Sequence, residues 1–300
     1  MAEIGRIVVS AYCQTGGLAA ALQPLYPRAE LHAVPVLDSV PDRRAFAELI
    51  QASDVWVNCQ GEDAGKWAQL AEANTRLRYV NVPLIEYRAF HPDMCTAYDA
   101  RSGENCRQKY SSRIGVWAYH RGLAAAAAAR LFDPASFARL GYLDCWSASR
   151  DLLQQRFARC GMAEYFERFY LRVKRSGQFM HTCTHPKADT LATLAKIVAL
   201  KLGADKAVFD RQIVIPDGLD FLRWPVYPEI AAVLSIPSTG YAWKMKQGTL
   251  PDDLFIDGIE AFLDYCFHHY RKQGIRPADI AVREVELSAI AEALHERAVA

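Results

Sequence analysis

One cysteine stands where an apolar strand gives way to a helix. In the stretch IVVSAYCQTGGLAAAL, residues 7–22, Cys13 and Gln14 follow the strand and a glycine pair opens the helix. The free N–H groups and the dipole of a helix N-terminus favour an anion, so a thiol placed there tends toward the reactive thiolate. The same groups bind an oxyanion or a phosphate, and Gly16 and Gly17 let a substrate approach the backbone closely. The stretch therefore predicts a nucleophile; the alternative is a buried thiol, with the glycines needed for tight helix–sheet packing.

A histidine that could activate this thiol lies much later in the chain. The stretch FMHTCTHPKADTLATLAKIVALKLG, residues 179–203, contains His181 and His185, and Pro186 suits the first turn of the helix that follows. An imidazole takes protons readily near neutral pH, so it is a suitable base for a thiol. We expect His185 to meet Cys13 across a cleft. The alternative is a histidine that caps the helix or packs beside Pro186, and His181 is interpreted as structural.

Polar residues also follow the third and fourth expected strands. Asn58 and Gln60 follow one strand, and the loop after the next carries His91 and Asp93. In an open parallel sheet, ligands bind outside the carboxyl ends of the strands, so these side chains are expected at one edge with the thiol. The amides could donate hydrogen bonds to a carbonyl oxygen, and the carboxylate could orient the imidazole or act on a hydroxyl. The alternatives are side chains that fix their loops and a simple turn at His91 and Asp93.

A basic stretch near the C-terminus suits a phosphate. In GYAWKMKQG, residues 240–248, Lys244 and Lys246 lie between aromatic and glycine residues in an expected loop. Their ammonium groups could bind a phosphate-bearing ligand. The alternative is a solvated basic turn.

Composition narrows the class of protein. The 300 residues carry a net charge of +1, so a basic surface for nucleic acid is not expected. No apolar run approaches the roughly 20 residues needed to span a bilayer, and the N-terminus lacks the pattern of a signal peptide. The eight cysteines lack metal-type spacing, so we expect reduced thiols, a cytoplasmic protein and no metal site.

The first ninety residues show repeated strand and helix signals. The elements that these signals predict would position the groups described above. A helix follows the first strand, and two more are expected at 42–52 and 64–73. Strands connected through helices favour a parallel sheet. The expected strands are Arg6–Ser10, Leu31–Leu37, Asp54–Asn58 and Arg78–Val82.

The rest of the chain is mostly helical in pattern. We therefore expect an α/β protein with an N-terminal parallel β-α-β sheet unit and a mostly helical C-terminal half. The division is placed as an α/β domain at 1–105 and a helical domain at 106–300 that completes the cleft. The expected helices of this half are Ile114–Phe132, Ser147–Arg175, Asp189–Leu202, Asp252–Gln273 and Ile280–Ala298.

Four short motifs in this order resemble the WcbI family of capsular polysaccharide biosynthesis enzymes. They are Ala11–Gln14, Asn58–Gln60, His91–Asp93 and Thr184–Pro186, and the similarity spans about residues 6–203. The resemblance implies an α/β core with a helical addition. It also implies binding of coenzyme A and transfer of an acetyl group to a sugar hydroxyl of a capsule precursor, with contacts to capsule-assembly proteins.

Two positions depart from the family pattern, which has asparagine before both the cysteine and the histidine. Here they are Tyr12 and Thr184, so Gln14, Gln60 or the backbone near Gly16 must supply the missing donors. With the resemblance, we assign catalysis to Cys13, Gln14, His185, His91 and Asp93, and coenzyme A binding to Gly16, Asn58, Gln60, Lys244 and Lys246.

The leading hypothesis is acetyl transfer from acetyl-CoA to a sugar or polysaccharide precursor. Cys13 could carry the acetyl group, or His185 could deprotonate the sugar hydroxyl for direct attack. One alternative is an SGNH-like carbohydrate esterase or deacetylase, which would use water and need no coenzyme A. Another is a non-catalytic subunit that binds coenzyme A or sugar, in which Cys13 would react like an ordinary thiol.

Overall fold

The chain forms two compact units, each built from two separate stretches. The structure is a computed structural model and describes residues 4–10, 12–34, 43–59, 74–108, 110–246 and 253–294. The first unit combines residues 1–87 with 148–220, and the second combines 88–147 with 221–300. A division at residue 105 differs from this arrangement, because residues 148–220 belong to the first unit and a helix within them packs on the helix that follows the first strand.

A parallel four-stranded sheet forms the base of the first unit. Its strand order is β2-β1-β3-β4, and every neighbouring pair is parallel. The strands begin and end within three residues of the expected bounds, which confirms the N-terminal parallel unit. The bounds are β1 Arg6–Ser10, β2 Glu30–Val34, β3 Val55–Asn58 and β4 Arg78–Asn81.

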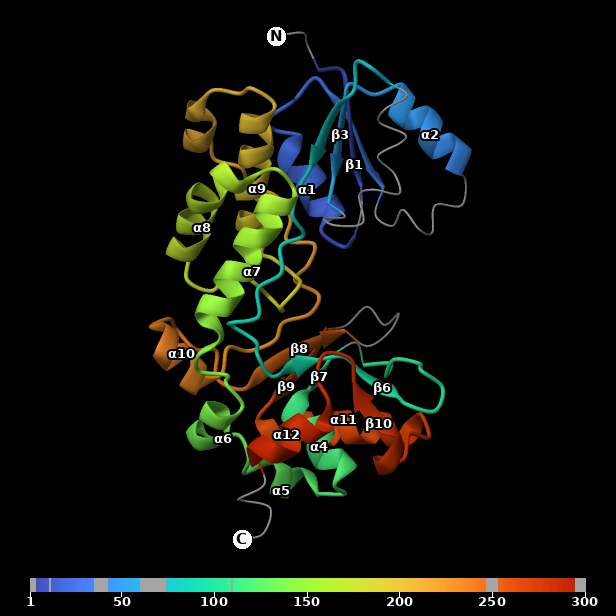
Figure 1. Ribbon diagram of the computed structural model, residues 1–300, viewed down its shortest axis with the longest axis vertical. Coiled ribbons are helices and arrows are strands. Elements are labelled where there is room, and N and C mark those ends of the chain that lie inside the picture. Colours follow the sequence, from blue (N-terminus) through green and yellow to red (C-terminus); the bar gives the residue numbers. More distant parts are fainter. Residues whose placement is uncertain are drawn as a thin grey trace. The chain divides into compact units, whose positions relative to one another are not determined.

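The two faces of this sheet are covered by different helices (Figure 1). Helix α2, Arg43–Gln51, packs Phe46 and Ile50 against Val8 and Trp56 of neighbouring strands. Because side chains alternate along a strand, the fully buried neighbours of Val8 in β1 point to the opposite face. Helix α1, Thr15–Leu22, lies on that side (Figure 1).

Helix α1 packs closely on helix α9, Ala188–Lys201. Gly17 allows the approach, because a Cβ there would overlap Cδ1 of the buried Leu191. A Cβ on the neighbouring Gly16 would meet no atom within 4 Å. The glycine pair thus has two separate uses: one residue brings the helices together, and the other leaves open space at the start of α1.

The expected helix at 147–175 is interrupted. It is α7, Cys145–Arg159, followed by a short 3-10 turn η3 at Ala163–Tyr165 and then by α8, Phe166–Arg175. Gly161 has a φ of +64°, a left-handed conformation that ends α7. The helix expected at 189–202 is confirmed as α9, whose ends differ from the prediction by one residue. A further 3-10 turn, η4 at Lys206–Asp210, follows it.

The second unit is a mixture of short strands and helices around an aromatic core. Trp243 stacks on Phe262 with ring centroids 4.1 Å apart, and Trp224 meets Phe262 edge-on. Its elements are β5 Met94–Cys95, β6 Ala97–Asp99, β7 Ser111–Ser112, α4 Arg113–His120, α5 Ala125–Ala129, α6 Pro134–Arg139, α10 Pro228–Leu234, β8 Ala242–Lys246, β9 Asp253–Asp257, α11 Ile259–Lys272, η5 Pro277–Asp279, β10 Ile280–Val282 and α12 Leu287–Leu294.

Two expected helices of this unit begin as strands. Residues 253–257 form β9, which pairs antiparallel with β8, and residues 280–282 form β10, which pairs antiparallel with β6. Gly258, at a φ of +90°, separates β9 from α11. Gly122, at a φ of +72°, likewise divides the helix expected at 114–132 into α4 and α5. Within the described residues, no helix combines the length and apolar character needed to cross a membrane.

The glycine pair of α1 gives a stability test with an internal control. Gly17→Ala is expected to lower the free energy of unfolding by about 1–3 kcal/mol, because the new methyl group overpacks the contact with Leu191. Gly16→Ala should leave it unchanged or raise it by up to about 1 kcal/mol, because alanine favours the helix and meets open space. Urea denaturation followed by circular dichroism measures both, and equal stabilities would contradict this account of the α1–α9 contact.

Candidate functional site

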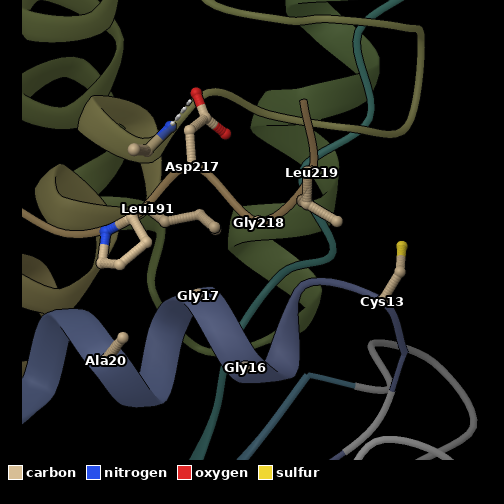
Figure 2. Close-up of a pocket in the computed structure, with 10 residues that line it drawn as sticks. Cys13, Gly16, Gly17, Ala20, Leu191, Asp217, Gly218 and Leu219 are labelled. Atoms are coloured by element: carbon tan, nitrogen blue, oxygen red, sulfur yellow. Dashed lines mark hydrogen bonds between the residues drawn. The ribbon is translucent and has the colours of Figure 1, made fainter. Parts of the chain in front are cut away.

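A pocket of about 250 Å³ opens between the start of α1 and the segment 216–219 of the first unit (Figure 2). The walls are mainly apolar or backbone, with Cys13 at one end and Asp217 across the space (Figure 2). The described residues that line it are Cys13, Gly16, Gly17 and Ala20 from the α1 region, Ala188 and Leu191 from α9, and Pro216, Asp217, Gly218 and Leu219.

Cys13 stands in the predicted place, one residue before the N-cap of α1. Of the eight cysteines, all of them within the described residues, Cys13 alone is exposed. The first i→i−4 bond of α1 is donated by Leu18 to Gln14. Gly16 and Gly17 precede that donor in the first turn of α1, where N–H groups have no i−4 partner within the helix, and both residues line the pocket.

Gln14 does not provide the expected oxyanion donor, because its side chain is fully used within the fold. The amide is 1% exposed. Its Nε2 donates to the carbonyl oxygens of Ile85, at 2.8 Å, and Thr184, at 3.0 Å. Its Oε1 accepts from the N–H of Ile85 at 3.1 Å. Gln14 therefore positions the turn that carries Cys13 and leaves the N-terminus of α1 without a side-chain cap.

The same hydrogen bonds bring the Cys13 turn to the segment that carries His185. That segment folds back on itself: His181 N–H donates to the carbonyl of His185 at 2.7 Å, and His185 N–H donates to Thr182 Oγ1 at 3.1 Å. The two regions predicted to meet are therefore neighbours through Thr184. His185 itself is 1% exposed and does not line the pocket that Cys13 lines.

An aspartate–histidine pair that the motifs did not reveal lies at this pocket. His181 Nε2 is 2.8 Å from Asp217 Oδ2, and its Nδ1 is 3.5 Å from Asp220 Oδ1. Asp217 lines the pocket, whereas His181 is buried behind it. The only local signal was the turn-forming Pro-Asp-Gly at 216–218, which says nothing about its distant partners.

Asn58 forms hydrogen bonds between neighbouring strands of the sheet. It is fully buried at the end of β3, where Oδ1 accepts from Ser10 Oγ at 3.2 Å and Nδ2 donates to Tyr79 Oη at 3.0 Å. Trp56 Nε1 donates to the same Ser10 hydroxyl at 2.8 Å. The polar atoms of Asn58 therefore form hydrogen bonds within the sheet. This differs from the expected contact between Asn58 and coenzyme A. Gln60 lies outside the described residues.

Asp93 and His91 belong to the second unit and are both buried there. Asp93 accepts from Tyr142 Oη at 2.9 Å, Tyr227 Oη at 2.8 Å and the N–H of Ile114 at 3.2 Å in the first turn of α4. Burial raises the pKa of its carboxyl group, and these hydrogen bonds act against the rise. The structure thus gives Asp93 a packing and capping role in place of the expected catalytic one, because its oxygens are enclosed and hydrogen-bonded.

The two lysines lie on a strand instead of a loop. Lys244 is part of β8, and its Nζ forms an ion pair with Asp253 Oδ2 of β9 at 2.8 Å. This pairing neutralises the charge that was expected to contact a phosphate. Lys246 ends β8, and its side chain lies outside the described part of the chain.

Comparison with known proteins places these features in a family. The family model described as polysaccharide biosynthesis enzyme WcbI matches residues 6–207. A solved structure of WcbI, described as a novel polysaccharide biosynthesis enzyme in its native form without a disulfide bond between coenzyme A and a cysteine, has the same fold. Its TM-score is 0.72 at 17% identity, over 98% of this chain and 96% of that one. No curated protein matches the chain. The matched range includes the Cys13 turn, the parallel sheet and α9, and the chain therefore belongs to the WcbI family of polysaccharide biosynthesis enzymes.

Proposed function

We propose that this enzyme transfers an acetyl group from acetyl-CoA to a sugar hydroxyl of a polysaccharide precursor, with the thioester bound at Cys13. The observation that carries the proposal is the exposed thiol at the open N-terminus of α1, facing a pocket. The related WcbI structure supports the choice of cosubstrate, because its description associates that protein with coenzyme A and a cysteine.

The shape and chemistry of the pocket suit the thiol end of coenzyme A. The walls are formed by glycine, alanine, leucine and proline residues, with one carboxylate. The pantetheine arm is a narrow, uncharged chain with apolar carbons and amide groups, so it matches such walls. The phosphates carry negative charge and belong outside a pocket that holds Asp217.

Two routes are consistent with this geometry. In the first, Cys13 Sγ attacks the thioester carbonyl, the bond to the coenzyme sulfur breaks, and the coenzyme leaves as a thiol with the proton of Cys13. A sugar hydroxyl then attacks the acetyl-cysteine, and its proton returns to the released thiolate. In the second, the hydroxyl attacks acetyl-CoA directly and Cys13 shapes the pocket. In both, we assign binding of the developing oxyanion to the N–H groups of Gly16 and Gly17, because these residues lie in the first turn of α1 and line the pocket.

The environments of the other thiols set Cys13 apart. Burial raises the pKa of Cys145 and Cys160 to about 11 and that of Cys106 to about 12. A thiol with such a pKa is almost entirely protonated at pH 8 and reacts slowly with electrophiles. Cys13 combines exposure with a helix N-terminus, which favours its thiolate.

Iodoacetamide labelling of the folded protein at pH 8 should therefore modify Cys13 first. Peptide mass spectrometry over a time course gives the rate at each cysteine, and Cys145, of intermediate exposure, is the matched comparison within the same chain. Cys13→Ser should abolish the fast phase and leave the slow labelling of Cys145 unchanged. Equal rates at Cys13 and Cys145 would argue for an ordinary thiol in place of a reactive one.

Intact mass spectrometry after incubation with acetyl-CoA distinguishes the two routes. The covalent route predicts one added acetyl group on the wild-type protein and on the control Cys145→Ser, and none on Cys13→Ser. Calorimetry with coenzyme A should show binding to all three proteins, since Cys13→Ser keeps the shape of the pocket. Binding of coenzyme A without any acetyl group on the wild-type protein would support direct transfer, and no binding of coenzyme A to the wild-type protein would refute the proposed function.

A further inference from the structure

Asp217 is the one charged residue among the described residues that line the Cys13 pocket. Its side chain is 34% exposed, so the carboxylate is open to a ligand. It lies in the segment 216–219, which is beyond the residues 6–207 that the family model matches. The role of Asp217 is therefore an inference from this structure and is not carried by the family match.

The carboxylate is held in one orientation by two groups, of which one is itself fixed by a further aspartate. Oδ2 faces His181 Nε2 at 2.8 Å and accepts from the N–H of Ala188, in the first turn of α9, at 3.3 Å. His181 is itself held on its other side, where Nδ1 lies 3.5 Å from Asp220 Oδ1. The second oxygen of Asp217 points away from the α9 terminus, toward the side on which Leu219 and Cys13 lie (Figure 2).

A fixed carboxylate oxygen in mainly apolar surroundings selects for a hydrogen-bond donor. It repels phosphate and other anions and accepts strongly from N–H or O–H groups, because a charged acceptor makes a stronger hydrogen bond than a neutral one. Coenzyme A carries amide N–H groups only in its pantetheine arm, and that arm ends in the sulfur that must reach Cys13. A contact with the arm would therefore set how the sulfur end enters the pocket.

We propose that Asp217 accepts a hydrogen bond from an amide N–H of the pantetheine arm and that His181 positions Asp217 for this contact. The inference rests on the proposed function, since it requires coenzyme A in the Cys13 pocket. Asp217 is a specificity residue that directs the thiol end of the coenzyme inward and the phosphates outward. His181 acts through it and contacts no ligand.

Binding of coenzyme A to Asp217→Asn tests the contact, with Asp189→Asn as the matched control. Asp189 is exposed in the first turn of α9, next to Ala188, and it does not line the pocket. Asp189→Asn therefore removes a negative charge from the start of α9 without changing the pocket walls. Calorimetry should show about 10-fold or greater weakening for Asp217→Asn and less than about 2-fold for Asp189→Asn. His181→Gln should weaken binding in the same direction, and adding it to Asp217→Asn should cause little further loss.

Adenosine 3′,5′-bisphosphate, which lacks the pantetheine arm, separates the contact from a structural effect. Its affinity should not fall in Asp217→Asn, and the thermal midpoint of that variant should match the Asp189→Asn control. If Asp217→Asn fails to fold, Asp217→Ser replaces it, because a serine hydroxyl can still accept from the α9 terminus. Unchanged affinity for coenzyme A in the folded variant, or an equal loss for both ligands, would overturn the role of Asp217. A wild-type protein that binds no coenzyme A would instead refute the proposed function.

Discussion

The buried amide of Gln14 joins three parts of the first unit that are far apart in the sequence. Its three hydrogen bonds link the turn after β1 to Ile85 and to Thr184. Leaving a buried backbone group without such a partner lowers the free energy of unfolding by about 1–3 kcal/mol. The three hydrogen bonds of Gln14 therefore strongly favour one arrangement of these segments. The position of Cys13 follows from it, because Cys13 is the neighbour of Gln14.

The hydrogen bonds of Gln14 also determine whether the N-terminus of α1 is capped by a side chain. Serine, threonine, aspartate or asparagine at an N-cap usually accepts a hydrogen bond from the first free N–H groups of its own helix. Gln14 instead turns into the protein, and α1 has no side-chain cap. Gly16 and Gly17, in the first turn of this uncapped helix, line the pocket together with an exposed thiol. One side chain thus connects the turn to two distant segments and leaves the helix without a side-chain cap.

The polar residues divide into those that hold the fold and those that face the pocket. Asn58 and Asp93 have the residue types of a binding site, yet both are buried with hydrogen-bonded partners, Asn58 within the sheet and Asp93 at the start of α4. Burial of Asp93 raises the pKa of its carboxyl group, which is the expected consequence of removing a carboxylate from water. Asp217, by contrast, keeps one oxygen fixed by His181 and Ala188 and stays partly exposed.

Local sequence patterns predicted the parallel sheet and the Cys13 turn, because apolar strands and a strand–helix junction leave local signals. The same patterns could not separate Asn58 from a ligand-binding amide, since the difference lies in the contacts of its side chain with Ser10 and Tyr79. Nor could they find Asp217, whose partner His181 is 36 positions away. The break at Gly161 was missed because apolar spacing continues on both sides of it.

The rate of Cys13 alkylation with and without bound coenzyme tests the central claim most directly. If the thiol end of coenzyme A occupies the pocket that Cys13 lines, saturating acetyl-CoA or desulfo-coenzyme A should slow alkylation of Cys13 by at least about 10-fold, because the bound arm blocks access to Sγ. The rate at Cys145, measured in the same samples, should not change. An unchanged rate at Cys13 under conditions where calorimetry shows coenzyme A bound would place the coenzyme elsewhere and contradict the account.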